Sequence, residues 1–151
     1  MGDVQWLDER EQTAWRSLIA LHTRLHAQLA RELAAVSDLT YGDYGILVRL
    51  TDRPEPRARL FELADELGWE RSRVSHQVSR MVTRGLVQKE RCDDDRRGAW
   101  VVLTDRGRAA IEAAAPSHVA SVRELFIDRL TPTELTTLTA LAQKVLPHLD
   151  D

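Results

Sequence analysis

Apolar residues recur at helical spacing along most of the chain, and short polar breaks divide this pattern into separate elements. Residues 7–36 carry one apolar stripe without Pro or Gly, which predicts a helix longer than most globular helices. A second helix is predicted over residues 41–51, and Thr40 or Asp43 is placed to cap its start. The two prolines within residues 52–57 then require extended or turn geometry.

The next segment combines two short helices with a tight turn between them. The first has an inner stripe at i, i+3, i+4 and i+7, formed by Leu60, Leu63, Ala64 and Leu67. We expect Gly68 to end this helix, because the residue after a helix C-terminus often needs a positive φ. The second helix starts near Arg71, and its expected inner residues are Val74, Val78, Met81 and Val82. This order of helix, glycine turn and helix is typical of a helix-turn-helix.

The second of these helices is basic on the side that its apolar residues leave free. Between Arg71 and Arg84 there are four arginines, one histidine and no carboxylate. Small polar residues let a helix approach a duplex, and Arg and Gln form bidentate contacts with base edges in the major groove. The candidates for major-groove contacts are Arg71, Ser72, Arg73, Ser75, His76 and Gln77, and those for phosphate contacts are Arg80 and Arg84. From this helix alone, the alternative is a basic face that is merely solvated.

A β-hairpin is predicted directly after this helix. Gly85 ends the helix, and two strands are predicted over residues 87–92 and 99–103, on either side of a charged turn at residues 93–98. Thr104 is placed as the N-cap of a further helix. A hairpin that follows a basic recognition helix is a wing, so the hairpin favours DNA binding over a solvated basic face.

The residues from Asp95 to Gly107 resemble the wing signature of MarR-type regulators. The pattern is Asp, one residue, Arg, three residues, an aliphatic residue, one residue, Leu-Thr, two residues and Gly. Val101 occupies the aliphatic position, where Leu is commoner. The helix-turn-helix and the order of elements over nearly the whole chain fit the same family. The resemblance implies a mainly α chain with a winged helix-turn-helix, a small antiparallel β wing and a short strand at residues 57–59 that pairs with the wing.

The resemblance also implies roles for residues in the wing and beside the DNA-binding module. Asp95, Arg96 and Arg97 are expected at the DNA, with Arg97 in a minor groove and Asp95 bracing the wing by pairing with an arginine. Members of the family often bind small aromatic or phenolic effectors between the dimer helices and the winged module. The candidate effector-binding residues in this sequence are Trp15, His22, Tyr41 and Tyr44.

Further helices are predicted after the wing. Residues 104–122 form an alanine-rich helical pattern, in which Pro116 predicts a kink or a break, and residues 123–130 continue it. Thr131 and Glu134, with a proline between them, form a capping box at the start of a final helix. That helix is apolar over more than one face, through Leu135, Leu138, Leu141, Ala142, Val145, Leu146 and Leu149.

The first and last helices carry more apolar surface than a lone chain of 17.2 kDa is expected to cover. We therefore expect a homodimer, with residues 1–36 and 108–151 as the helical dimerisation region and residues 37–107 as the winged helix-turn-helix domain. A symmetric dimer binds a pseudo-palindrome whose half-sites lie about 10 base pairs apart.

The charge distribution supports a partner that carries phosphates. The 151 residues have a net charge of −3, but residues 57–108 contain twelve Lys/Arg and nine Asp/Glu, a net of +3. The remaining residues contain nine basic and fifteen acidic side chains, a net of −6. A basic middle between acidic flanks favours nucleic-acid binding by the middle segment. The sequence also lacks a secretory signal and a long apolar run, which predicts a soluble cytoplasmic protein without membrane contact.

Other kinds of chemistry find little support. There is no glycine-rich phosphate loop, no nucleophilic triad and no cofactor motif, so we expect neither an enzyme nor a cofactor. His22 and His26 have the spacing of a metal pair, and three consecutive acids occupy residues 93–95, but neither group has evident further ligands. Two alternatives to an effector-released repressor stay open: a dimeric interaction module that does not bind DNA, and a regulator that senses oxidants through Cys92.

Overall fold

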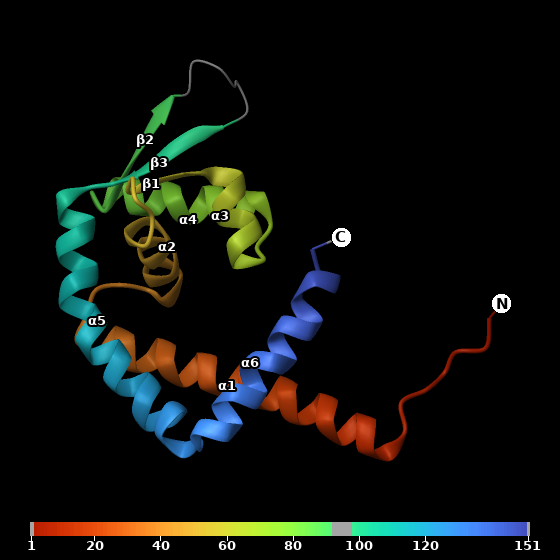
Figure 1. Cartoon of the computed structure of the whole chain (residues 1–151). Coiled ribbons are helices and arrows are strands. Elements are labelled where there is room, and N and C mark those ends of the chain that lie inside the picture. Colours follow the sequence, from red (N-terminus) through yellow and green to blue (C-terminus); the bar gives the residue numbers. More distant parts are fainter. Residues whose placement is uncertain (1, 92–97, 151) are drawn as a thin grey trace. The chain divides into compact units, whose positions relative to one another are not determined.

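The computed structural model describes residues 2–91 and 98–150, and it is mainly helical with one small antiparallel sheet (Figure 1). The predicted fold class is thereby confirmed. The elements are α1 (Glu9–Val36), α2 (Tyr41–Thr51), β1 (Arg57–Arg59), α3 (Leu60–Leu67), α4 (Arg71–Thr83), β2 (Val87–Arg91), β3 (Ala99–Leu103), α5 (Asp105–Leu125) and α6 (Pro132–Val145). Two short 3-10 turns cover Ile127–Arg129 and Leu146–His148.

The chain forms two compact units whose limits fall inside the long helices. One unit comprises Met1–Leu29 and Val119–Asp151, and the other is Ala30–His118. The second unit therefore contains the helix-turn-helix and the sheet, together with the end of α1 and the first part of α5. The functional division that the sequence predicts, at residues 36 and 107, stays a prediction.

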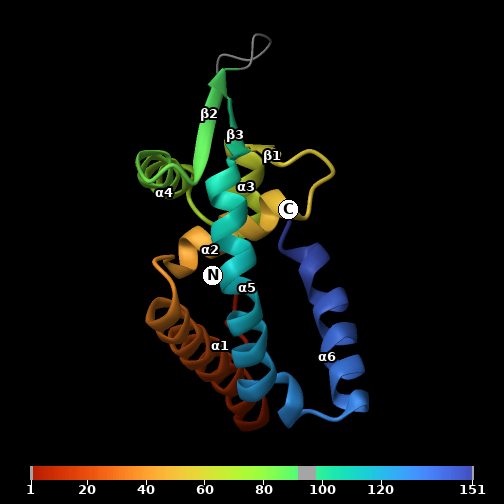
Figure 2. The same ribbon diagram turned by 90° about the vertical axis from the view of Figure 1, so that its left-hand side faces the viewer.

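The sheet of the second unit has the strand order β1-β3-β2, with both pairs antiparallel. Arg59 lies opposite Trp100 in the first pair, and Val87 lies opposite Leu103 in the second. The short strand expected at residues 57–59 is thus present and pairs with the hairpin. In Figure 1, α2, α3 and α4 lie below these strands, and β2 and β3 extend upward beyond them, as they also do in Figure 2.

The hydrophobic core lies between α2, α3, α4 and the sheet. Ile46, Leu47 and Leu50 from α2 are completely buried, as are Leu63 from α3 and Val74 from α4. Burial of such side chains stabilises the fold by about 1.5–3 kcal/mol each. The core holds α4 against α2 and α3 and leaves its opposite side exposed. Gly68 ends α3 in the left-handed region with φ of 63°, as expected for the turn of a helix-turn-helix.

The junction between the hairpin and α5 explains the end of the wing signature. The Thr104 hydroxyl donates to the Gly85 carbonyl at 2.6 Å and accepts the Gly107 backbone N–H at 3.0 Å. It thereby caps α5, as predicted, and ties it to the turn after α4. Gly107 packs directly on this turn: a Cβ added there would lie 2.0 Å from the Leu86 carbonyl oxygen. No residue larger than glycine fits at this position without a shift of the backbone.

The helices after the wing differ in part from expectation. α5 continues through Pro116 to Leu125, so the helix has no break there, and the alternative of a kink stays a prediction. Of the helical pattern over residues 123–130, the first three residues continue α5, and Ile127–Arg129 form a separate 3-10 turn. At α6, the predicted capping box is confirmed: Glu134 N–H donates to the Thr131 hydroxyl at 3.2 Å, and Thr131 N–H donates to the Glu134 carboxylate at 2.8 Å. Hydrogen bonding of the Glu134 carboxylate to the Thr131 backbone N–H, and to the Thr131 side chain, lowers the pKa of the Glu134 carboxyl.

Candidate nucleic-acid interface

The exposed side of α4 carries most of the residues predicted to contact DNA. Arg71, Ser72, Arg73, His76 and Arg80 are exposed, and Ser75 is partly exposed. The opposite side of the helix is formed by Val74, Val78 and Met81, which are completely buried. Val82, which the sequence places on the inner side, is instead 38% exposed. The helix therefore presents a basic and small-polar surface that is free of carboxylates along its length.

Arg73 is held at the start of α4 by an aromatic side chain from the helix-turn-helix turn. Its guanidinium carbon lies 3.8 Å from the centre of the Trp69 ring, a cation–π distance. Trp69 itself packs against the core. Trp69 is absent from the residues predicted from the sequence, because it lies in the turn before α4, where helical spacing does not apply.

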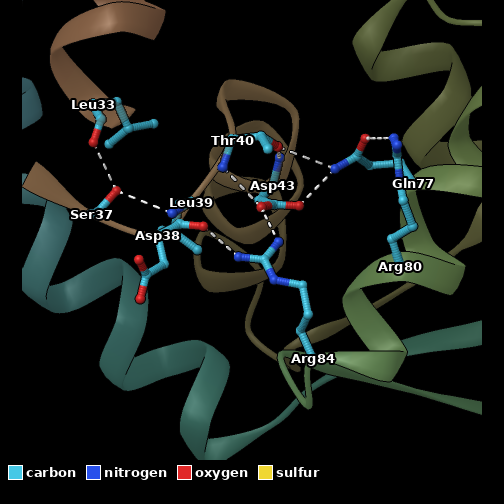
Figure 3. A network of polar contacts seen from close by, with 9 residues as sticks. All are labelled: Leu33, Ser37, Asp38, Leu39, Thr40, Asp43, Gln77, Arg80 and Arg84. Atoms are coloured by element: carbon cyan, nitrogen blue, oxygen red, sulfur yellow. Dashed lines mark hydrogen bonds and ion pairs between the residues drawn. The ribbon is translucent and has the colours of Figure 1, made fainter. Parts of the chain in front are cut away.

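Gln77 does not lie on the exposed side of α4, and its predicted role in major-groove contacts stays a prediction. It is only 8% exposed, and its amide nitrogen donates to the Asp43 carboxylate at 2.6 Å and to the Thr40 hydroxyl at 3.3 Å (Figure 3). The cause is Asp43, whose completely buried carboxylate requires hydrogen-bond donors. Gln77 supplies one of them from the inner flank of α4.

Arg84 is likewise occupied within the protein, where it has a structural role, and its predicted phosphate contact stays a prediction. Its guanidinium donates to the Asp43 carboxylate and to the Asp38 carbonyl, both at 2.5 Å (Figure 3). A buried carboxylate needs a cationic partner, and Arg84 is that partner. Arg80 remains exposed, and one of its guanidinium nitrogens donates to the Gln77 amide oxygen at 2.9 Å.

A second group of basic residues lies at the base of the hairpin. The guanidinium carbons of Arg57 and Arg59, on β1, lie 4.4 and 4.5 Å from the centre of the Trp100 ring on β3. On β2, the ammonium of Lys89 donates to the Ser79 hydroxyl of α4 at 3.3 Å, which links the hairpin to the recognition helix. The predicted wing residues Asp95, Arg96 and Arg97, and the candidate redox residue Cys92, lie outside the described residues.

The residues predicted to bind an effector fall in different compact units. Tyr41 and Tyr44 belong to the unit Ala30–His118, whereas Trp15 and His22 belong to the other unit. Both tyrosine rings lie next to the imidazole of His118. The distance between ring centres is 5.7 Å for Tyr41 and 4.4 Å for Tyr44. Sequence reasoning missed His118, because nothing in the local pattern connects α5 with a helix more than seventy residues earlier.

Burial shifts the pKa values of the side chains in this aromatic cluster. It raises the pKa of both the Tyr41 and the Tyr44 phenols, and for Tyr44 the nearby Tyr41 and Asp52 raise it further. Burial also lowers the pKa of His118, so its neutral form is favoured. The His118 Nδ1 atom is buried and has no hydrogen-bond partner among the residues that the structure describes.

The sequence also offers His22 and His26 as a candidate metal-binding pair. His22 and His26 have ring centres 6.0 Å apart on α1. Within residues 2–91 and 98–150, no group of three His, Cys, Asp or Glu side chains is placed to bind a metal ion. The same described part of the chain has no helix with the length and apolar character needed to span a membrane. A surface pocket of about 480 Å³ lies between the turn at residues 37–39, Arg84 and α5, but neither tyrosine lines it.

Comparisons with known proteins agree with this architecture. The MarR family profile matches residues 37–98. The transcriptional regulator HosA of Escherichia coli is 30% identical over 132 residues, which are 87% of this chain and 90% of HosA.

Two solved structures from Streptomyces coelicolor are similar over almost their whole length. AbsC, a MarR family transcriptional regulator, is 41% identical with a TM-score of 0.88, over 97% of this chain and 98% of AbsC. Sco3205, a MarR family transcriptional regulator in complex with DNA, is 38% identical with a TM-score of 0.92, over 99% of this chain and 93% of Sco3205. These relatives are transcriptional regulators and not enzymes, and this chain belongs to the same MarR family of winged helix-turn-helix transcriptional regulators.

Proposed function

We propose that this regulator binds double-stranded DNA as a homodimer on a pseudo-palindromic operator and acts as a repressor. The observation that carries the proposal is the exposed side of α4, with Arg71, Arg73, His76 and Arg80 interspersed with small polar residues. Such a helix fits the major groove, where Arg reads guanine and phosphate contacts supply most of the affinity. Repression is the simplest consequence of operator occupancy, because a bound dimer excludes other proteins from the same duplex.

The apolar surfaces of α1 and α6 support a homodimer. Trp15 on α1 is 55% exposed, and Leu141 and Val145 on α6 are 57% and 53% exposed. Leu18 and Ile19 extend the stripe on α1, and none of the residues of α6 is buried within the single chain. Contiguous exposed apolar surface of this kind marks an interface in a protein that stays in solution. We expect residues 7–36 and 108–149 to form most of it.

Selection of bound genomic fragments, followed by binding assays across a salt series, tests the DNA proposal. A regulator that contacts several phosphates shows a steep linear decrease of log affinity with log salt concentration, by about 0.9 per phosphate. A selected duplex should bind at least a thousandfold more tightly than a scrambled one. Absence of binding to any duplex would favour the alternative of an interaction module that does not bind DNA.

A small aromatic or phenolic effector remains part of the proposal. The support for it is the cluster of Tyr41, Tyr44 and His118, in which the buried His118 Nδ1 atom lacks a partner among the described residues. A phenol hydroxyl offers a donor to this nitrogen, and its ring would stack with the two tyrosines. Tyr44 is also a core residue, since it is only 8% exposed and belongs to the hydrophobic core.

A thermal-shift screen of simple phenols and aromatic acids tests the effector. A ligand that binds the folded protein raises the melting temperature by mass action. The variant His118→Phe keeps an aromatic ring but removes the nitrogen, so it should lose this response. If Tyr44 contacts the ligand, Tyr44→Ala should change the ligand-induced release from DNA. If Tyr44 is only a core residue, the substitution should lower DNA affinity and stability and leave the ligand response unchanged.

A further inference from the structure

The amide of Gln77 joins the inside of the protein to a cation on its DNA-facing side. On the inner side, the amide nitrogen donates to the Asp43 carboxylate at 2.6 Å and to the Thr40 hydroxyl at 3.3 Å. On the outer side, the amide oxygen accepts from a guanidinium nitrogen of Arg80 at 2.9 Å. Figure 3 shows these residues in one continuous chain of contacts from α2 to α4.

The chemistry of Asp43 fixes which way this amide points. An ionised carboxylate only accepts hydrogen bonds, so it must face the NH₂ group of Gln77 and not the oxygen. The second oxygen of Asp43 is already occupied, because it accepts the Thr40 backbone N–H at 2.9 Å and the Arg84 guanidinium at 2.5 Å. The Gln77 oxygen is therefore turned outward, toward Arg80.

Packing confines the same side chain. Because Gly42 has no side chain, there is space beside it for Gln77. A Cβ at Gly42 would lie 3.2 Å from the Gln77 amide carbon and 3.0 Å from the Trp69 side chain. Gln77 thus has little freedom to move, and Asp43 belongs to the capping box that begins α2. The acceptor that Arg80 uses is anchored in the core and not on a mobile surface side chain.

The difference between Arg80 and Arg84 lies in the charge of the acceptor. Arg84 is paired with a carboxylate, which offsets its positive charge. Arg80 is oriented by a neutral amide, which leaves its charge available for a phosphate. Orientation before binding lowers the entropy lost when a long side chain is immobilised.

We propose that Gln77, oriented by Asp43, is a positioning residue that holds the Arg80 guanidinium ready for a DNA phosphate without neutralising it. This inference rests on the proposed DNA binding. It assigns Gln77 an indirect role at the interface, in place of contact with a base edge.

A double-mutant cycle tests the positioning role, with affinities measured on a selected duplex over several salt concentrations. Gln77→Met keeps the length of the side chain and removes both hydrogen-bonding groups. We expect it to weaken binding about threefold to tenfold, the equivalent of ordering one long side chain, with little change in salt dependence. Arg80→Ala should weaken binding about tenfold and make the log–log salt slope shallower by about 0.9, because one counterion fewer is released.

The decisive variant combines both substitutions. If Gln77 acts through Arg80, the double variant binds like Arg80→Ala alone, because Gln77 has nothing left to position. Arg73→Ala is the matched control: Arg73 contacts Trp69 and not Gln77, so its cost should be the same with and without Gln77→Met. Additive costs of Gln77→Met and Arg80→Ala would overturn the inference, as would an Arg80→Ala variant with unchanged affinity and slope. Failure of the unsubstituted chain to bind any duplex would instead refute the proposed function.

A measurement on the unsubstituted protein covers the case in which Gln77→Met does not fold. Nitrogen relaxation of the arginine side chains, without DNA, should give the Arg80 guanidinium an order parameter close to that of ordered backbone, about 0.8. Arg71, exposed on the same helix, should give a value below about 0.6. Equal mobility of the two side chains would show that Arg80 is not held in place and would overturn the inference.

Discussion

Trp69 and Arg73 form a stacked pair at the start of the recognition helix, with the guanidinium carbon 3.8 Å from the centre of the indole ring. Trp69 lies in the turn between α3 and α4 and packs against the core, so the ring is a fixed support. A guanidinium that lies over an aromatic face can still donate hydrogen bonds from the nitrogens at its edge. We therefore expect Arg73 to be available for bidentate contact with guanine.

Trp69→Leu should therefore weaken sequence-specific binding more than non-specific binding. Loss of an exposed cation–π contact costs about 0.5–1 kcal/mol, and this loss should appear on the selected duplex and not on a scrambled one. Trp69→Phe is the control, because a phenyl ring keeps both the packing and part of the stack. Arg73→Ala itself should cost roughly 1–3 kcal/mol on the selected duplex and relax preference at one base pair of each half-site. Equal losses on both duplexes would mean that Arg73 contacts a phosphate.

Asp43→Asn should destabilise the folded protein by about 2 kcal/mol, because it removes an acceptor of several buried hydrogen bonds and leaves Arg84 without a carboxylate. Arg84 is 36% exposed, so water compensates part of this loss. Denaturant unfolding at one fixed protein concentration measures the change. Asp38→Asn is the matched control, because Arg84 contacts the backbone carbonyl of Asp38 and not its carboxylate; it should change stability by less than about 0.5 kcal/mol.

Gly107→Ala should be much more damaging than Gly68→Ala. At Gly107 the added methyl carbon would meet the Leu86 carbonyl oxygen at 2.0 Å, which forces apart the junction of wing and α5 and costs about 3 kcal/mol or more. At Gly68 no atom lies within 4 Å of the added carbon, and only the positive φ of 63° opposes it, at a cost of about 1–2 kcal/mol. Similar melting temperatures for the two variants would contradict the close packing at Gly107.

The sequence predicted the elements well because their boundaries have local causes. Gly68 ends α3 through its own backbone freedom, and Thr131 and Glu134 cap α6 through hydrogen bonds within four residues. The strand at Arg57–Arg59 was predicted only from the family resemblance, since its pairing partner is more than forty residues away.

It was harder to predict which residues of α4 are buried and which are exposed, and the spacing of the buried residues explains why. Val74, Gln77, Val78 and Met81 form an i, i+3, i+4, i+7 stripe, and these are the four buried residues of the helix. The polarity of Gln77 suggested an exposed side chain, and the apolar character of Val82 suggested a buried one. Periodicity was the better guide, because the donors that Asp43 requires make a buried glutamine favourable at this position.

The network around Asp43 could not be predicted from sequence alone. Its capping role at the start of α2 follows from the spacing to Thr40, and the structure confirms it. Its bonds to Gln77 and Arg84 join residues 34 and 41 positions away, and only the packing of α2 against α4 brings them together. The same limit applies to His118, whose neighbours Tyr41 and Tyr44 lie on another helix.

Leu141→Glu should convert the proposed homodimer into monomers. Leu141 is 57% exposed in the single chain, so a monomer would tolerate a charge there with little effect. In a dimer whose apolar helices are buried against each other, the same carboxylate loses its hydration without a partner. Gln143→Glu is the control, because residue 143 lies about 200° around α6 from Leu141. Sedimentation at micromolar concentration should show the dimer for the unsubstituted chain and for Gln143→Glu; a monomeric unsubstituted chain would refute the assembly.

His118 should make the stability of the protein depend on pH in the mildly acidic range. Burial lowers the pKa of its imidazole in the folded state, so the unfolded chain, with a histidine pKa of about 6.5, takes up the proton first. The stability that neutral His118 contributes is therefore complete above about pH 6.5 and decreases as pH falls from there through the folded-state pKa. The phenols of Tyr41 and Tyr44 do not titrate in this range, because burial raises their pKa.

Unfolding free energies of the unsubstituted chain and of His118→Phe, measured between pH 5 and 8, isolate the effect, since every other titratable group is common to both proteins. The difference in stability between the two should change with pH in favour of His118→Phe as acid is added; a difference that is constant with pH would show that His118 is not shielded from water.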